Sequence, residues 1–120
     1  MIELLLKLEM SLWINETRNN PGYLDRILHN DFQEFAKSGR IYSKNDILKN
    51  SNFNIEAVFP FKKLNVKQID EQTFLITYQA ELVENERTIV SNRSSIWIGK
   101  ENFQLIFHQG TLVNEDFNNE

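Results

Sequence analysis

The stretch TFLITYQAELVENERTIVSNRSSIWI, residues 73–98, decides the fold that this sequence predicts. It holds two runs rich in β-branched and aromatic residues, which the polar pair Asn85-Glu86 separates, and a third run follows at 103–113. Runs of this composition with short polar turns between them are typical of antiparallel strands. We therefore predict a meander of long strands over 73–83, 87–98 and 103–113.

Earlier segments add two strands, over 55–61 and 64–69, and a short hairpin. In this hairpin the segment DFQEFA, residues 31–36, is the first strand, and the turn Lys37–Arg40 returns the chain through Ile41-Tyr42. The sequence order, with helices before a long meander, is typical of an α+β fold with a curved, mostly antiparallel sheet and helices on one face.

The N-terminal region predicts helices. Helical spacing over residues 1–19 places six apolar side chains on one face, which indicates one long helix: Ile2, Leu5, Leu6, Leu8, Leu12 and Trp13. Two short helices are expected over 23–28 and 44–50, and Ser43 is the expected N-cap of the second one.

Composition indicates one domain, residues 1–113, and a polar acidic tail, residues 114–120. The 120 residues carry a net charge of −4 with no basic stripe, which argues against a nucleic-acid partner. Charged residues interrupt the apolar opening MIELLLKLEM, so neither a signal peptide nor a membrane span is expected. The chain has no cysteine, and we expect a cytoplasmic protein.

Strand register brings polar side chains onto one face of the sheet. If Asn85-Glu86 is a two-residue turn, Tyr78 falls opposite Arg93. If Lys100-Glu101 is the next tip, Arg93 falls opposite His108. Cross-strand neighbours lie about 5 Å apart, so a row of Tyr78, Arg93 and His108 is expected. The neighbouring rows contain Ser95 and Trp97.

Glu9 lies at the centre of the apolar face of the predicted long helix, with Trp13 one turn later. A buried charge without a partner is strongly unfavourable, and the sheet offers Arg93 as that partner. Together these groups predict a pocket that prefers a compact, partly apolar or aromatic molecule with an acidic or carbonyl group. The candidate ligand-binding residues are Glu9, Trp13, Glu34, Tyr78, Arg93, Ser95, Trp97 and His108, with Glu34 at the rim.

The opposite face of the sheet is also half apolar. An apolar second face in a small protein has to be covered, and a second copy of the chain is an economical cover. We therefore expect a homodimer that packs sheet against sheet through Leu75, Ile96, Leu105 and Phe107.

Several segments together resemble a known family: LEMSLW, LHNDFQEFAKSGRIYSKNDIL, TYQAEL, RSSIW and FQLIFHQGT. They are similar to an uncharacterised bacterial domain family of the nuclear transport factor 2-like superfold, which includes SnoaL-like cyclases and ketosteroid isomerases. The resemblance covers residues 4–111 and implies a cone, in which a curved sheet wraps around a long N-terminal helix. It also implies a pocket at the open end and frequent dimers. The isomerase's catalytic residues do not carry over.

Three functions remain open from the sequence. The first is a small-molecule-binding domain. The second is a cofactor-independent isomerase, cyclase or hydrolase in which His108 or Glu34 moves a proton. The third is a dimeric interaction module with a filled core. The alternative for His108 is a hydrogen-bonded core residue. The alternative for Glu34 is pairing with a nearby arginine, for example Arg40. With two histidines, no cysteine and no glycine-rich phosphate loop, neither a metal nor a cofactor is expected.

Overall fold

The computed structural model describes residues 1–50 and 52–113, and the predicted tail at 114–120 lies outside these residues. One curved sheet contains all six strands of the described chain in the order β2-β1-β6-β5-β4-β3. These strands are β1 Leu28–Phe35, β2 Ile41–Ser43, β3 Ala57–Asp70, β4 Thr73–Glu84, β5 Arg87–Ile98 and β6 Gln104–Leu112. Because β1 runs parallel to β6 and the other pairs are antiparallel, the sheet is mixed.

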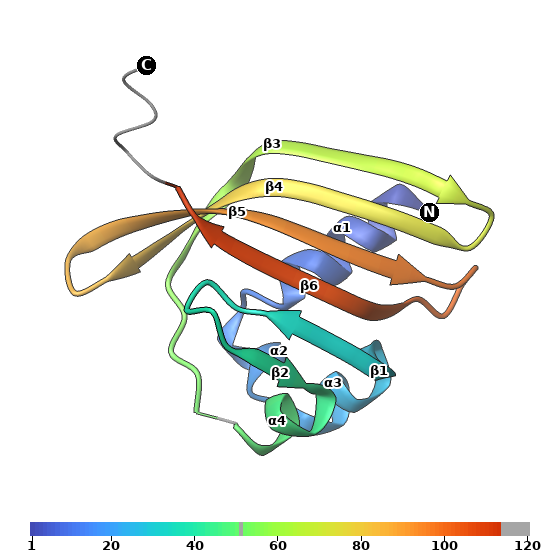
Figure 1. The fold of residues 1–120 in the computed structure, drawn as a ribbon, viewed down its shortest axis with the longest axis horizontal. Helices are drawn as coiled ribbons and strands as arrows, with labels where there is room; N and C mark the ends of the chain where they lie inside the picture. Colours follow the sequence, from blue (N-terminus) through green and yellow to red (C-terminus); the bar gives the residue numbers. More distant parts are fainter. Residues whose placement is uncertain (51, 114–120) are drawn as a thin grey trace.

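Four helices accompany the sheet in the described residues: α1 Ile2–Ser11, α2 Asn15–Arg18, α3 Pro21–Ile27 and α4 Lys44–Lys49. Helix α1 crosses one face of the sheet behind β4 and β5, and the short helices gather beside β1 and β2 (Figure 1). The predicted α+β class and curved sheet are thus confirmed. No helix in residues 1–50 and 52–113 has the length and apolar character that a membrane crossing requires.

The prediction of a single helix over residues 1–19 is wrong, because α1 ends at Ser11 and α2 begins at Asn15. The Thr17 hydroxyl donates to the Ser11 carbonyl at 2.5 Å across the break. Ile14, between the helices, has an extended backbone with φ of −113° and ψ of 127°, which interrupts the helical run before α2. Trp13 in this turn lies in the core, where it is 7% exposed.

The hairpin of β4 and β5 has the predicted register. Asn85 and Glu86 form a two-residue turn with φ of 51° and 66°, as a type I′ turn requires. Tyr78 consequently lies opposite Arg93.

The hairpin of β5 and β6 differs from its prediction. The strands are joined by residues 99–103 instead of a tip at Lys100-Glu101, and the register shifts between Ile96 and Trp97. As a result, His108 lies opposite Ser95, and Gly110 lies opposite Arg93. The irregularity also reverses the face of one residue: Leu105, predicted on the outer face, is 1% exposed in the core.

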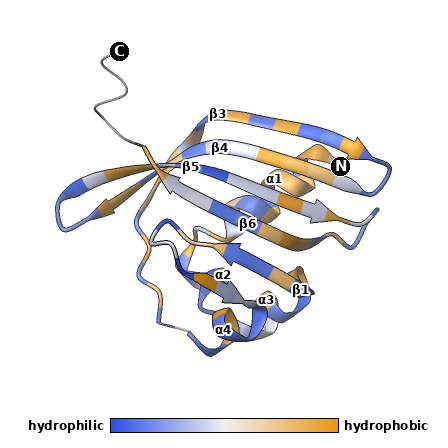
Figure 2. Cartoon of the chain, in the orientation of Figure 1, coloured by the Kyte–Doolittle hydropathy of each residue, from blue (hydrophilic) through white to orange (hydrophobic). Residues whose placement is uncertain are grey.

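The two strands predicted over 55–61 and 64–69 are a single strand, β3. It contains a cis Phe59-Pro60 bond and a residue of positive φ, Lys63 at 55°, and its pairing with β4 shifts register at three places. This edge strand carries both hydrophobic and hydrophilic stretches (Figure 2), and most of its residues are exposed.

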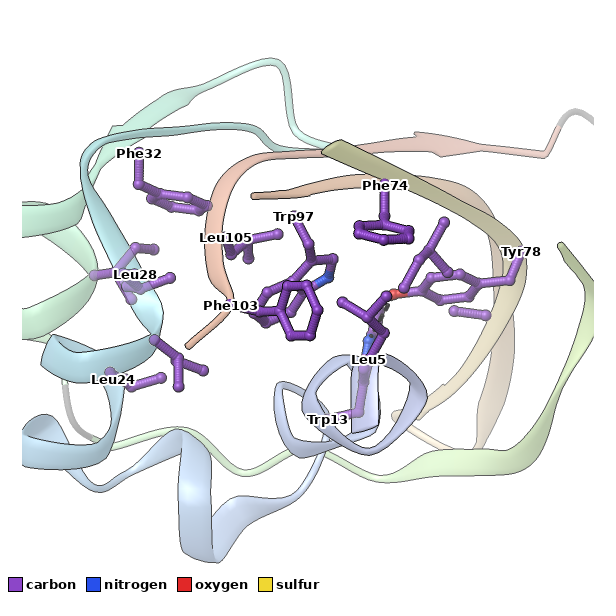
Figure 3. Close-up of a cluster of buried hydrophobic side chains, with 14 residues drawn as sticks. Leu5, Trp13, Leu24, Leu28, Phe32, Phe74, Tyr78, Trp97, Phe103 and Leu105 are labelled. Carbon is purple, nitrogen blue, oxygen red and sulfur yellow. Dashed lines mark hydrogen bonds between the residues drawn. The ribbon is translucent and has the colours of Figure 1, made fainter. Parts of the chain in front are cut away.

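The core lies between α1 and the inner face of the sheet. Leu5 and Trp13 point from the helical layer toward aromatic side chains of the strands, including Phe74, Tyr78 and Trp97 (Figure 3). Trp97 is fully buried. Burial of apolar side chains on this scale, at about 25 cal/mol per Å², is the main force that holds α1 on the sheet.

We predict that Glu86→Gly stabilises the protein by about 0.5–1 kcal/mol, because glycine adopts positive φ without strain. Urea unfolding at equilibrium measures the change. Glu71→Gly in the turn between β3 and β4, where φ is not positive, is the matched control and should give no gain. A loss of stability in Glu86→Gly would contradict the type I′ assignment.

Candidate functional site

Glu9 of α1 is fully buried and accepts three hydrogen bonds from the sheet. Trp97 Nε1 donates to Oε1 at 2.8 Å, and Oε2 accepts from the Tyr78 hydroxyl at 2.5 Å and from the Ser95 hydroxyl at 2.8 Å. The donors stand on β4 and β5, so this one carboxylate joins α1 to two adjacent strands. Charge-assisted hydrogen bonds of this kind are among the strong ones in proteins.

Donor and acceptor roles around Glu9 are fixed by Trp13. Its indole N–H lies 2.9 Å from the Tyr78 hydroxyl, and an indole can only donate. Tyr78 therefore accepts from Trp13 and gives its own proton to Glu9. Burial raises the pKa of Glu9, and the bonds from Trp97, Tyr78 and Ser95 oppose the rise. These three bonds stabilise the ionised form of the carboxyl group, whereas burial favours the protonated form.

His108 of β6 extends this network toward Arg93. Its Nδ1 lies 2.7 Å from Ser95 Oγ and 3.8 Å from Glu9 Oε2, and its Nε2 lies 3.4 Å from Arg93 Nη1. Burial, together with the positive charges of Arg93 and Arg18, lowers the pKa of His108 to about 3. The imidazole is therefore neutral at physiological pH.

Arg93 is 7% exposed, and among the described residues no carboxylate lies within ion-pair distance of its guanidinium. Burial lowers the pKa of Arg93, and the negative charge of Glu34 is one of those that oppose the shift. Its guanidinium carbon lies 4.8 Å from the centre of the Trp13 ring, and its Nε donates to Ser91 Oγ at 2.8 Å. A Cβ atom at Gly110 would collide with the guanidinium of Arg93, so glycine at this position makes room for that group.

The predicted direct pairing of Glu9 with Arg93 is wrong. Among the described residues, Arg93 takes part in no ion pair. Ser95 and His108 lie between the two charges and connect them by hydrogen bonds. This arrangement results from the irregular pairing of β5 with β6, because the register shift moves His108 away from the position opposite Arg93.

A cavity of about 270 Å³ lies beside this network. Its wall contains residues of α2, α4, β1, the segment 53–56 and the three central strands, and most of them are apolar. The charged or titratable groups in the wall are Arg18, Glu34, Glu56, Glu84, Arg93 and His108. No group of three or more His, Cys, Asp or Glu suited to a metal ion occurs in residues 1–50 and 52–113.

Arg18 and Glu34 place opposite charges in the cavity wall. Burial lowers the pKa of Arg18, and the charge of Glu34 opposes this shift. Burial raises the pKa of Glu34, and the positive charges of Arg18 and Arg93 oppose it. The Arg18 guanidinium also lies over Phe53, 4.1 Å from the ring centre. Among the described ion pairs none joins Glu34 to Arg40, so the nearby arginines that act on Glu34 are Arg18 and Arg93 and not Arg40.

Two asparagines of the α2 region hold the segment 53–55 against the cavity. The side chain of Asn15 accepts from Ile55 N–H at 2.7 Å and donates to its carbonyl at 3.2 Å. Asn19 does the same with Phe53, at 2.7 and 2.8 Å. Each amide thus replaces the neighbouring strand that this extended segment lacks.

The structure divides the eight sequence-predicted site residues into two groups. Four of them line the cavity: Trp13, Glu34, Arg93 and His108. The other four form the buried network behind it and do not line it: Glu9, Tyr78, Ser95 and Trp97. The network touches the cavity wall where Ser95 bonds to His108 and where Tyr78 bonds to Trp13.

Sequence reasoning missed Arg18, Asn15 and Asn19. The three residues lie in the stretch whose spacing predicts one long amphipathic helix, where polar residues are normally solvent-exposed. The spacing of four between the asparagines places them on one side of a helix, and this was the available signal. Nothing local indicates that the partner of this side is the segment 53–55.

Solved structures with the same fold are similar to this chain at low sequence identity. An NTF2-like protein from Cytophaga hutchinsonii superposes with a TM-score of 0.76 at 18% identity, over 94% of this chain and 98% of that chain. A putative Ca/calmodulin-dependent kinase II association domain from Exiguobacterium sibiricum gives 0.71 at 19% identity, over 94% and 91%. A CaMKII hub from S. rosetta gives 0.69 at 10% identity, over 92% and 93%.

No family model matches the chain, and no curated protein matches it in sequence. The superpositions show that the chain has the NTF2-like fold, which confirms at the level of fold the resemblance seen in the sequence. The same fold serves many unrelated functions, so the function has to be inferred from the site.

We predict that His108 makes the protein acid-sensitive. The folded-state pKa of His108 is lowered to about 3, so as pH falls below about 6.5 the unfolded chain binds a proton that the folded protein excludes. Stability should fall over this window by several kcal/mol in total. Urea unfolding at about pH 7 and at about pH 4.5 measures the loss.

His108→Gln should reduce this acid-dependent loss, whereas His29→Gln, at a partly exposed position, should leave it intact. The raised pKa values of Glu9 and Glu34 act in the opposite direction, because a raised carboxyl pKa makes stability increase as pH falls. Both carboxyl groups are present in both variants, so their contributions to the pH dependence of stability cancel when the two variants are compared. An equal loss in wild type and His108→Gln would contradict the buried neutral imidazole.

Proposed function

We propose that this NTF2-like fold binds a compact, partly apolar organic anion in the cavity, with the acid group of the ligand facing Arg93. The observation that carries the proposal is the buried guanidinium of Arg93 in the cavity wall, which has no ion-pair partner in the described residues. A buried charge is costly without a counter-charge. A ligand carboxylate would supply it and fit the planar fork of the guanidinium.

Size and wall chemistry support a compact ligand. The volume of about 270 Å³ is near the lower end of the range for small-molecule sites, roughly 300 Å³. Apolar side chains such as Phe32, Ile47 and Leu82 supply most of the wall, and a few charged groups can orient the ligand. Arg18 adds a second positive charge, which Glu34 offsets in part. A cavity of this kind favours ligand binding over a filled-core interaction module.

Proton transfer by Glu34 is a second candidate function. The raised pKa of Glu34 and its place in the cavity wall are the usual features of a carboxyl acid–base catalyst. His108 suits this role less well, because its lowered pKa makes it a weak base and Ser95 already bonds to Nδ1. A ligand that undergoes enolisation or isomerisation in the presence of the protein, and no longer does with Glu34→Gln, would favour the enzyme.

The test of anion binding is a thermal-shift series of compact carboxylic acids, each paired with its carboxamide. We expect acids to stabilise the protein more than their amides, and Arg93→Met to remove the difference. Loss of a charge-assisted bond of about 1.5–3 kcal/mol weakens binding tenfold or more. Gly110→Ala keeps the charge but displaces the guanidinium and should also weaken binding. Equal binding of acids and amides by the wild type would contradict the proposal.

Arg87→Ala is the control for loss of a positive charge, because Arg87 is exposed at the start of β5 and lies outside the cavity wall. It should bind the same acids as the wild type.

We further propose that the outer sheet face is covered by a second copy of the chain. Leu75, Ile96 and Phe107 are half-buried neighbours in one row across three strands. The Phe35 ring lies edge-on to Phe107, with 5.3 Å between centres, and is 43% exposed. In an isologous contact the same patch of both copies meets, and the assembly ends at the dimer. Two structural neighbours are named as association or hub domains, which is compatible with self-association. Leu105, expected in this patch, is excluded because it faces the core.

Light scattering tests the assembly. We expect about twice the chain mass of 14.2 kDa for the wild type. Phe107→Glu should give a monomer with an intact fold, because dimer formation would bury the new carboxylate in the contact. Ile69→Glu, at an apolar position of β3 that is 54% exposed, is the matched control and should remain dimeric. A wild-type monomer at micromolar concentrations would contradict the proposal.

A further inference from the structure

We infer that Glu9, acting through Ser95, holds His108 in the tautomer with a proton on Nδ1, so that Nε2 is a fixed hydrogen-bond acceptor beside Arg93. Glu9 and Ser95 are positioning residues in this arrangement, and His108 determines specificity. Ser95 and Glu9 lie on the Nδ1 side of the imidazole, and Arg93 lies on the Nε2 side.

The first support for this tautomer comes from the Ser95 hydroxyl. The Ser95 hydroxyl has one proton to donate. Glu9 Oε2 lies 2.8 Å away, and this buried oxygen requires hydrogen-bond donors because no water reaches it. If Ser95 donates to Glu9, its oxygen accepts from His108 Nδ1–H at 2.7 Å. The proximity of the Glu9 carboxylate to Nδ1, 3.8 Å, also favours a proton there.

The second support comes from the other edge of the ring. Arg93 has donors and no acceptor, and its Nη1 lies 3.4 Å from His108 Nε2. A proton on Nε2 would place two donors against each other, whereas an unprotonated Nε2 accepts from Arg93. Both edges of the imidazole therefore require the same tautomer, and the neutral state of the ring is consistent with it.

The cavity then presents a donor and an acceptor next to each other. Arg93 offers N–H groups and His108 offers the Nε2 lone pair, and both residues line the cavity. If the proposed function holds, the matching ligand carries a carboxylate for Arg93 and an O–H or N–H donor beside it for Nε2. The bond from Arg93 to Nε2 is long. A donor group of the ligand can therefore replace this bond, or Nε2 can accept from both donors. The chemical class is a 2-hydroxy acid or its N–H counterpart.

The tautomer is tested by long-range ¹H–¹⁵N NMR on protein labelled with ¹⁵N-histidine, with His29→Gln to assign the two rings. We expect the His108 spectrum of a protonated Nδ1 and an unprotonated Nε2, unchanged between about pH 5 and 8. Ser95→Ala should reduce the population of this tautomer, and Ser95→Thr, which keeps the hydroxyl, should restore it. A wild-type spectrum with the proton on Nε2, or with averaged tautomers, would overturn the inference even if the variants do not fold. So would an unchanged tautomer in folded Ser95→Ala.

Ligand selection is tested with mandelate and phenylacetate, which differ by one hydroxyl group. We expect the wild type to bind mandelate several-fold more tightly, and His108→Leu to lose the preference while it still binds phenylacetate. Equal affinities in the wild type would overturn the donor–acceptor selection and leave the proposed anion binding intact. If neither acid binds, anion binding at this cavity is wrong and the selection with it, whereas the tautomer is still decided by the spectrum.

Discussion

The buried carboxylate of Glu9 is the interaction on which the rest of the structure depends. An ionised acid in a protein interior is tolerated only when donors surround it, and here Tyr78, Ser95 and Trp97 all donate to it. Their common orientation requires the register of β4 and β5 that the structure has, because a slip of one residue would turn each strand's donors to the other face. Helix α1 is fixed by the same bonds, so the polar network specifies an arrangement that apolar packing alone would leave free to slide.

The fold was predictable because its signals are local. Composition and turn residues place β4 and β5 almost to the residue, and Asn85-Glu86 determines how they pair. The importance of Glu9 was also visible, since a single acid in the middle of an apolar helical face demands a partner. The identity of that partner was not, because the choice between Arg93 and the donors Tyr78 and Trp97 depends on distances in three dimensions.

Features that depend on small irregularities escaped prediction. The register shift between Ile96 and Trp97 leaves no mark in the sequence, yet it brings His108 opposite Ser95 and turns Leu105 to the core. The break after Ser11 occurs where Ile14 adopts an extended backbone, and neither proline nor glycine marks this point in the sequence. The part of the site formed by the α2 region and residues 53–55 joins partners that are 34 or 40 positions apart in the sequence, and no periodicity relates them.

Residues 53–55 are attached to the rest of the molecule in an unusual way. Four hydrogen bonds from the amide groups of Asn15 and Asn19 hold them, and the first backbone bond to β4 comes at Glu56, whose carbonyl accepts from Val83 N–H. Each asparagine thus satisfies one backbone donor and one backbone acceptor. Loss of either side chain would leave two main-chain groups of this wall without their partners, so the course of the backbone here depends on side-chain chemistry in a helix far away in the sequence.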